Sequence, residues 1–257
     1  MALELDARQR AMLQDMGVTV WLPAAVPPAV TKAELPRMPA RTPPAAASPA
    51  VMPSEALAAD GPTLAAQAQA CQACGLCAGR DRATLSAQRW PADAAALQAD
   101  WFIVGDPPDD EENRAGQPFM GQSGQLLDAM LKAVGAQRQG QGRTAAYLSN
   151  VVKCHPMPGR VAQVAELAAC AQFLNQELAL VRPKVVLAMG RFATQLLLQE
   201  HPAAASLPLG KQRGTVYRYR GLPVVVTYHP KVLLRASADK AKAWADLCLA
   251  MELVDAA

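Results

Sequence analysis

From about residue 64 onwards, short apolar runs alternate with longer stretches of helical periodicity. The apolar runs are strand candidates because they are short and bounded by turn residues. They lie at 101–105, 146–152, 184–189, 214–219 and 223–227. Helical periodicity fits the stretches 122–134, 162–180, 190–199 and 239–254. This alternation predicts an α/β fold, a three-layer α/β/α sandwich with a central, mostly parallel sheet.

Three polar clusters lie at the ends of predicted strands. They read GDPPD after the first strand, NVVKCHP at the end of the second, and TYHPKVLLR at the end of the last. In open α/β sheets, ligands bind outside the carboxyl ends of the strands. We therefore expect the three clusters to converge on one active cleft.

The first part of the chain has a different composition. Residues 22–63 carry ten prolines among many alanines and few bulky apolar residues, which predicts an extended, largely disordered linker. Before it, Asp6 can cap a short helix over 7–16. The expected organisation is a short N-terminal helix/strand element at 1–21, the linker, and one domain at 64–257. The N-terminal element is a candidate docking segment, either for the domain or for a protein partner.

The bulk composition is typical of a globular protein without membrane segments. The chain is 51% hydrophobic and 18% charged, and no apolar run is long enough to cross a bilayer. The N-terminus is charged and amphipathic and lacks the apolar core of a secretory signal. We expect a cytoplasmic, monomeric protein, in which reduced cysteines serve metals or catalysis rather than disulfides.

The net charge of +3 is small, but its distribution is uneven. Residues 129–165 and 201–238 contain no acidic residue. Their bases are Lys132, Arg138, Arg143, Lys153, Arg160, Lys211, Arg213, Arg218, Arg220, Lys231 and Arg235. If these segments meet in space, they form a surface for a polyanion such as DNA; otherwise they are a scattered solvated surface.

Six cysteines occur, and five of them fall in two groups. The run CQACGLC contains Cys71, Cys74 and Cys77, and such C-x2-C pairs let one turn present two thiolates to a metal. Cys154 and Cys170 lie sixteen positions apart, at a strand end and in the following helix. Thiolates from these segments can bind zinc or an iron–sulfur cluster, and Cys77 can replace Cys71 as the partner of Cys74. Cys248 is interpreted as a lone structural cysteine.

Taken together, the motifs show a resemblance to a known family. The chain from about 64 to 252 resembles the family 4 uracil-DNA glycosylases, the iron–sulfur branch of that superfamily. The blocks CQACGLCAGR, RAGQPFMGQSGQLLD, YLSNVVKCHP, RPKVVLAMGRFA and VTYHPKVLLR occur in the family's order, and Cys170 falls where the fourth cluster ligand is expected. The resemblance implies the uracil-DNA glycosylase fold and a [4Fe–4S] cluster held by Cys71, Cys74, Cys154 and Cys170. In this family the cluster ties loops together and takes no part in hydrolysis.

The resemblance also implies roles for residues at the strand ends. Phe119 would stack on a flipped uracil beside Gly105, and Asn150 would read the polar edge of the base. Asp106 would activate water, and His229 would lie near uracil O2, where negative charge develops. These residue types suit those tasks, because an aromatic face supports a base, an amide offers a donor and an acceptor, and an aimed donor stabilises an oxyanion.

The segment HPKVLLR is the expected DNA contact. Leu233 or Leu234 would enter the duplex as a wedge, while Lys231 and Arg235 would lie on phosphates.

Several residues depart from the family pattern around these motifs. The family places G-E-A-P-G at the end of the first strand, whereas this chain has Asp106 in place of the glutamate and Asp109 in place of the second glycine. Pro107 removes a backbone N–H. Lys231 replaces the serine of H-P-S. The neighbouring Asp110, Glu111 and Glu112 are interpreted as solvated loop surface.

The leading hypothesis is a uracil-DNA glycosylase that hydrolyses the N-glycosidic bond of deoxyuridine in base excision repair. The alternative is a catalytically impaired glycosylase-like module that binds DNA or protein, which the departures favour. A third hypothesis, a cysteine-zinc α/β hydrolase, rests on the thiols alone.

Overall fold

A computed structural model describes residues 60–86, 98–138, 140 and 142–256. All of them lie within one compact unit, Ser48–Ala257; the other unit, Met1–Ala47, lies outside the described residues. The predicted element at 1–21 and most of the predicted linker also lie outside them. Residues 60–63, assigned above to the linker, instead begin a helix. Asp60 caps it through a 2.7 Å hydrogen bond from Thr63 N to Oδ1.

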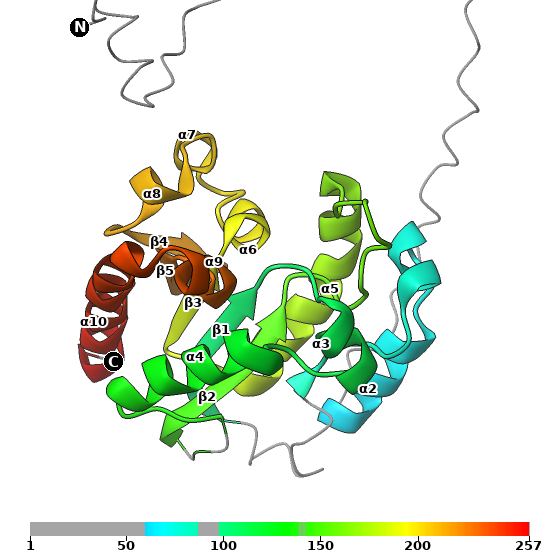
Figure 1. The fold of residues 1–257 in the computed structure, drawn as a ribbon. Coiled ribbons are helices and arrows are strands. Elements are labelled where there is room, and N and C mark those ends of the chain that lie inside the picture. Colours follow the sequence, from blue (N-terminus) through cyan, green and yellow to red (C-terminus); the bar gives the residue numbers. More distant parts are fainter. Residues whose placement is uncertain (1–59, 87–97, 139, 141, 257) are drawn as a thin grey trace, which may run out of the picture. The chain divides into compact units, whose positions relative to one another are not determined.

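The centre of the domain is a five-stranded sheet with the order β2-β1-β3-β5-β4 (Figure 1). Its strands are β1 (Ala99–Gly105), β2 (Gly142–Asn150), β3 (Val185–Met189), β4 (Val216–Tyr219) and β5 (Leu222–Thr227). All neighbours pair in parallel except β4, which is antiparallel to β5. The five strands correspond to the five predicted ones. The second ends at Asn150, two residues earlier than expected.

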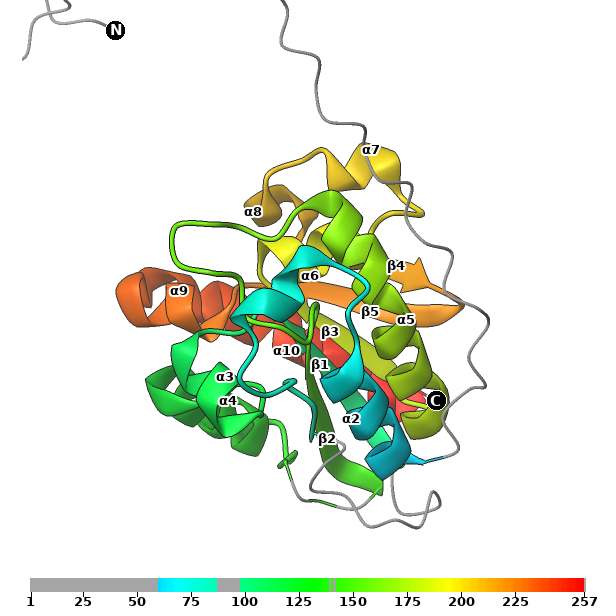
Figure 2. The ribbon, with the colours of Figure 1, turned by 90° about the vertical axis from the view of Figure 1, so that its right-hand side faces the viewer.

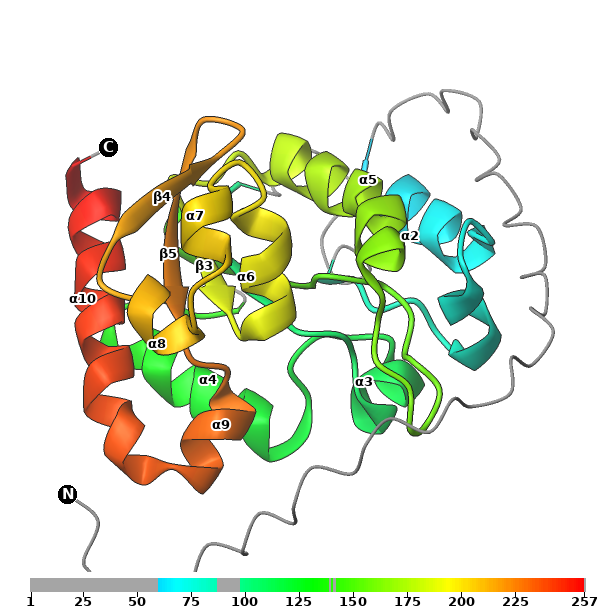
Figure 3. The same ribbon diagram turned by 90° about the horizontal axis from the view of Figure 1, so that it is seen from above.

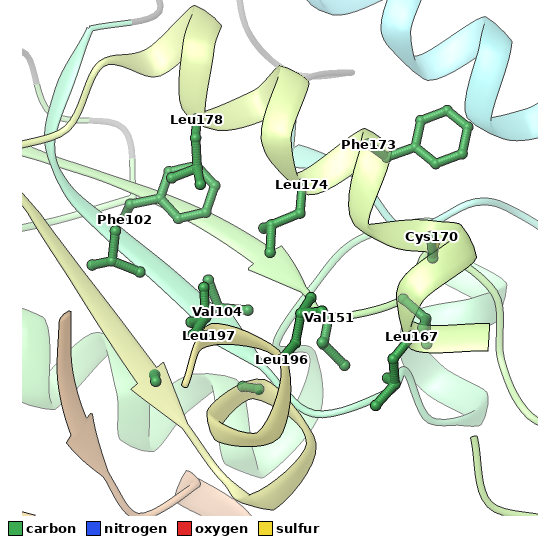
Figure 4. Close-up of a cluster of buried hydrophobic side chains, with 14 of the residues drawn as sticks. Phe102, Val104, Val151, Leu167, Cys170, Phe173, Leu174, Leu178, Leu196 and Leu197 are labelled. Carbon is green, nitrogen blue, oxygen red and sulfur yellow. The ribbon is translucent and has the colours of Figure 1, made fainter. Parts of the chain in front are cut away.

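Helices cover both faces of this sheet, as Figures 2 and 3 show. Phe102 and Val104 of β1 pack in one apolar cluster with residues of α5 (Val164–Val181) and α6 (Arg191–Leu197) (Figure 4). The alternate residues Trp101 and Ile103 pack in a second cluster with α4 (Gly121–Ala133) and α10 (Lys240–Ala256). Successive strand side chains point to opposite faces, so the apolar run 101–104 of β1 packs against helices on both faces of the sheet. The predicted three-layer sandwich is confirmed.

Shorter helices complete the domain. They are α2 (Gly61–Ala70), η1 (Gly75–Gly79), α3 (Asp110–Ala115), α7 (Pro202–Ala205), α8 (Leu209–Gln212), α9 (Pro230–Arg235) and η4 (Ser237–Asp239). The short helix α3 directly follows the cluster GDPPD, and α9 forms the second part of the cluster TYHPKVLLR; neither helix was expected. Among the helices that the structure describes, none combines the length and apolar character that a bilayer crossing requires.

Candidate nucleobase-binding site

The parallel register of β1 and β2 places Gly105 beside Asn150 at the carboxyl edge of the sheet. The Nδ2 atom of Asn150 donates to the carbonyl of Asp106 at 2.9 Å and to Oε1 of Glu112 at 3.3 Å. Both partners can only accept, so the amide must turn its NH2 group towards them. Its Oδ1 atom is buried and has no hydrogen-bond partner among the described residues. Asn150 therefore presents one free acceptor in the interior of the site.

Phe119 lies against the same strand end. Its ring approaches Gly105 so closely that a Cβ atom at position 105 would lie 2.6 Å from Cζ. A glycine is therefore required there. Phe119 itself has a φ of 54°, a left-handed conformation rarely adopted by an aromatic residue. Two backbone contacts hold it: its N–H donates to Glu112 Oε1 at 2.5 Å, and its carbonyl accepts from Arg138 at 2.8 Å.

The His229 ring stacks on Phe119, with centroids 5.3 Å apart and an angle of 13° between the planes. The side chain is 3% exposed, and burial lowers the pKa of His229 to about 3. Its Nδ1 atom accepts a 3.2 Å hydrogen bond from Lys231 N at the start of α9. A neutral imidazole that accepts at Nδ1 carries its proton on Nε2. His229 is thus a neutral residue with an Nε2–H donor.

Asp106 follows directly after β1, and its carboxylate faces the start of α6. Oδ1 accepts from Phe192 N at 2.7 Å and from Ala193 N at 3.3 Å. Burial raises the pKa of Asp106 above its usual value, and these backbone donors oppose the rise. Gly190, with a φ of 101°, leaves room for the carboxylate, since a Cβ there would lie 2.3 Å from Oδ2. The turn after β3 therefore fixes the orientation of Asp106, which the sequence did not reveal.

Glu112 is the residue of this site that sequence reasoning missed. The interpretation of Asp110 and Glu111 as exposed is confirmed, but for Glu112 it is wrong, because its side chain is 1% exposed. The acidic run forms α3, which turns Glu112 inwards towards Asn150 and Phe119. Burial raises the pKa of Glu112, and the nearby Lys231 opposes that rise. The capping signal was present in the sequence, since an aspartate three residues before a glutamate is typical of a helix start.

The two departures from the family pattern at Asp109 and Lys231 lie in contact. Lys231 Nζ is 2.8 Å from Asp109 Oδ2 and 3.3 Å from Glu112 Oε2. Asp109 also caps α3, accepting from Glu112 N at 2.9 Å. The added negative charge and the added positive charge therefore neutralise each other at the edge of the site.

Five cysteines come together at a cavity that Phe119, Asn150 and His229 do not line. One cavity is lined by Cys71, Cys74, Cys77, Cys154 and Cys170, together with Lys153. Arg80 Nη1 donates to Cys154 Sγ at 3.2 Å, and Lys153 N donates to Cys170 Sγ at 3.3 Å. Burial raises the pKa of the Cys170 thiol to about 12. No three His, Cys, Asp or Glu side chains within the described ranges form a ligand group for a single metal ion; these thiols instead surround a shared cavity.

A buried ion pair connects the cysteine cavity with the end of β2. Lys153 Nζ contacts Glu177 Oε2 at 2.5 Å, and the two side chains are 1% and 0% exposed. The same ammonium donates to the Asn150 carbonyl at 2.9 Å. Tyr147 and Ser149 donate to the Glu177 carboxylate at 3.0 and 2.8 Å. The backbone of Asn150 and the segment that carries Cys154 thus share one polar network.

The expected DNA-contact residues lie on α9. Leu233 is 1% exposed and packs into the domain, whereas Leu234 is 45% exposed. Of the two wedge candidates, Leu234 is the one that this structure presents to solvent. Arg235 is exposed in the last turn of α9.

Several bases of the two acid-free segments contact carboxylates of the protein. These bases are Arg138, Lys153, Arg160, Arg213 and Lys231. Lys153 is too deeply buried to contribute to a surface for a polyanion.

Fold and site together define an α/β domain in which an aromatic ring, an amide and a neutral imidazole meet at the carboxyl edge of the sheet. The family model of the Uracil DNA glycosylase superfamily matches residues 92–248. This match covers more than half of the chain, so the chain belongs to that superfamily.

Curated relatives carry the same family description. The chain is 33% identical over 152 residues to a type-4 uracil-DNA glycosylase of Pyrobaculum aerophilum, covering 58% of this chain and 74% of that one. It is 30% identical over 140 residues to the type-4 enzyme of Sulfurisphaera tokodaii, covering 53% of this chain and 62% of the relative. The chain thus spans less than two thirds of the latter protein. A type-5 uracil-DNA glycosylase of Pyrobaculum aerophilum is 30% identical over 130 residues, covering 47% of this chain and 56% of that one.

Proposed function

We propose that the protein is a uracil-DNA glycosylase that hydrolyses the N-glycosidic bond of deoxyuridine in DNA. The observation that carries this proposal is the unpartnered, buried Oδ1 atom of Asn150 beside Phe119 and His229. A buried acceptor without a partner is costly unless a ligand supplies the donor. Uracil supplies one at N3–H. The type-4 names of several relatives support the same activity.

In this proposal, the base leaves the DNA stack and enters the site. Phe119 supplies an aromatic surface for the base, and Gly105 allows the close approach of the ring to β1. Asn150 Oδ1 accepts from N3–H. The Nε2–H group of His229 stabilises the negative charge that develops on uracil O2 as the glycosidic bond breaks. Because His229 is neutral, it acts as a hydrogen-bond donor rather than as a cation.

Asp106 is the proposed base that positions and activates the attacking water. The rise of its pKa caused by burial makes the carboxylate a stronger base than a solvated aspartate. Its backbone hydrogen bonds to Phe192 and Ala193 restrict its rotation. Restriction of this kind favours a fixed direction of attack on the sugar.

We propose that the cysteine cavity holds a [4Fe–4S] cluster through Cys71, Cys74, Cys154 and Cys170. The support is that these thiols line one cavity and that two of them accept N–H hydrogen bonds of the kind that stabilise cluster sulfurs. The bound cluster would tie the segment around Cys71 to the loop after β2 and to α5. Cys77 lines the same cavity and is the competing ligand.

Iron, sulfide and zinc per chain, with the visible absorption spectrum, test the cluster. Replacing Cys154 or Cys170 with serine should remove the iron and the absorption, and Cys248→Ser should change neither. Cys77→Ser decides whether Cys77 is a ligand. Zinc without sulfide in the purified protein would contradict the cluster.

The activity is tested with cluster-loaded protein and an oligonucleotide that carries one deoxyuridine. We expect release of uracil and an alkali-labile site, and no cleavage of the same strand with thymidine. Asp106→Asn should lower kcat by about 10²–10⁴-fold, and His229→Ala by about 10²–10³-fold. Tight DNA binding without uracil release would contradict hydrolysis and favour a binding module.

A further inference from the structure

The carboxylate of Glu112 accepts hydrogen bonds from four neighbouring groups of the site. At Oε1 it accepts from Phe119 N at 2.5 Å and from Asn150 Nδ2 at 3.3 Å. At Oε2 it accepts from Asp109 N at 2.8 Å and from Lys231 Nζ at 3.3 Å. All four neighbours are donors, so the group is required as an acceptor at both oxygens. With a side chain 1% exposed, Glu112 makes these contacts away from bulk solvent.

These contacts determine which atom of Asn150 is available to a ligand. An amide NH2 group has two hydrogens, and in Asn150 they face the Asp106 carbonyl and Glu112 Oε1. The opposite orientation would direct the amide oxygen at two other oxygens. Glu112 and the Asp106 carbonyl together exclude the flipped amide and leave Oδ1 as the free acceptor.

We infer that Glu112 is a positioning residue that sets the base specificity of this site by acting through Asn150. This inference rests on the proposed function, in which Asn150 recognises the base. It identifies Glu112 as the residue that holds Asn150 in the orientation needed for this recognition. A ring that presents N–H at position 3, as uracil does, matches the fixed Oδ1 acceptor. Cytosine has a lone pair at N3, which would face Oδ1 without a shared hydrogen. A site whose polar group is left unpaired by the wrong ligand rejects that ligand strongly.

The same carboxylate also fixes the base-stacking residue. Phe119 has a backbone conformation that aromatic residues rarely adopt, and its N–H points to Glu112 Oε1. The aromatic surface and the reading amide are therefore held relative to each other by one oxygen atom. Lys231, itself held by Asp109, places a positive charge beside Glu112 and favours its ionised form.

The test compares binding of two oligonucleotides that differ in one base. One carries 2′-fluorodeoxyuridine and the other 2′-fluorodeoxycytidine, because an electron-withdrawing fluorine slows glycosidic cleavage through its oxocarbenium-like transition state. The readout is the ratio of the two affinities on one protein preparation. A fraction of unfolded protein lowers both affinities equally and leaves this ratio unchanged. The proteins are wild type, Glu112→Gln, Asn150→Ala, the double variant, and Glu111→Gln as the matched exposed control on α3.

A glutamine at 112 keeps the size of the side chain but replaces one acceptor oxygen with a donor. One pair of contacts must then be lost, and we expect the preference for uracil to fall by about tenfold or more. Glu111→Gln should keep the wild-type ratio. Asn150→Ala should abolish the preference, and adding Glu112→Gln should then change nothing further, since coupled residues are not additive.

An unchanged affinity ratio in Glu112→Gln would overturn the inference. It would also be overturned if Glu112→Gln lowered the ratio equally in the wild-type and in the Asn150→Ala background. A wild-type ratio near one would also overturn it. A clear wild-type preference in a protein that does not hydrolyse ordinary deoxyuridine would contradict the proposed reaction and leave the role of Glu112 supported.

Discussion

At the scale of single residues, His229 shows how burial determines chemistry. Its ring is covered by Phe119 and by the start of α9, and its Nδ1 atom is occupied by the N–H of Lys231. The pKa of about 3 that results from this burial keeps the ring uncharged throughout the neutral range. A neutral donor stabilises a developing anion without forming a stable ion pair with it in the ground state.

The stability of the protein should therefore depend on His229 at acidic pH. The folded pKa lies below the value of 6.5 for a free histidine, so the unfolded chain takes up a proton first as the pH falls. Stability present above about pH 6.5 is then lost progressively towards about pH 3. Urea unfolding from pH 7 to pH 4 should show a decrease of several kcal/mol that is reduced in His229→Gln. If the free energy of unfolding depends on pH in the same way in both proteins, the imidazole is protonated in the folded state as well.

At the scale of elements, two short helices bring the site together. Helix α3 is capped by Asp109 and α9 by His229, so in each helix the capping residue also belongs to the site. Lys231 of α9 contacts both Asp109 and Glu112 of the α3 segment. Helices of this length are not stable alone, and each depends on the other and on the sheet for its position.

A double-mutant cycle should detect the contact between these helices. Asp109→Asn removes the charge but keeps a good helix cap, and Lys231→Met removes the ammonium but keeps the apolar stem. Because both side chains are 37% exposed, we expect a coupling of only about 0.5–1 kcal/mol in the free energy of unfolding. Strictly additive effects would mean that the pair does not stabilise the contact.

Helix α9 should matter more for duplex DNA than for single strands. An apolar side chain that enters the duplex helps to unstack the target base, and a single strand needs less of this help. Leu234→Ala should therefore slow uracil release from duplex DNA by about tenfold and from single strands by much less. Val232→Ala is the matched control, since Val232 is 43% exposed on the same helix. Equal losses on both substrates would contradict a wedge.

At the scale of the whole molecule, the Lys153–Glu177 pair joins the sheet, α5 and the cysteine cavity. Both charges are fully buried, and Tyr147, Ser149 and the Asn150 carbonyl complete their hydrogen bonds. Lys153 also lines the cavity that the five cysteines surround. The end of β2 and the cysteine cavity are therefore connected by one buried polar network.

Lys153→Met should destabilise the protein by about 3–5 kcal/mol, because it leaves the Glu177 charge buried without its partner. The control is Lys242→Met, which removes a lysine from an exposed pair with Asp239 and should change the free energy of unfolding far less. Chemical denaturation of the purified proteins measures both changes in the free energy of unfolding. Similar losses of unfolding free energy in the two variants would show that the buried pair stabilises the protein no more than the surface pair does.

Much of this architecture was predictable from the sequence. The strands and long helices follow from apolar periodicity, and the order of motifs predicted that Gly105, Asn150 and His229 would meet. Glu111 and Glu112 show where such reasoning ends. They are adjacent and identical in type, and only the direction of α3 against the sheet buries one and exposes the other. The anchoring of Asp106 by the turn after β3 likewise depends on contacts between segments some 86 residues apart.

The contact of Lys231 with both Asp109 and Glu112 means that the lysine and the aspartate depend on each other unequally. Consider a chain that starts with the glycine and serine of the family pattern. A lysine arriving first at position 231 finds the buried carboxylate of Glu112 as a partner. An aspartate arriving first at position 109 adds a second negative charge beside that carboxylate without any cation. Lys231→Ser should therefore destabilise the protein more than Asp109→Gly, because the first leaves Asp109 and Glu112 without their cation and the second leaves Lys231 paired with Glu112.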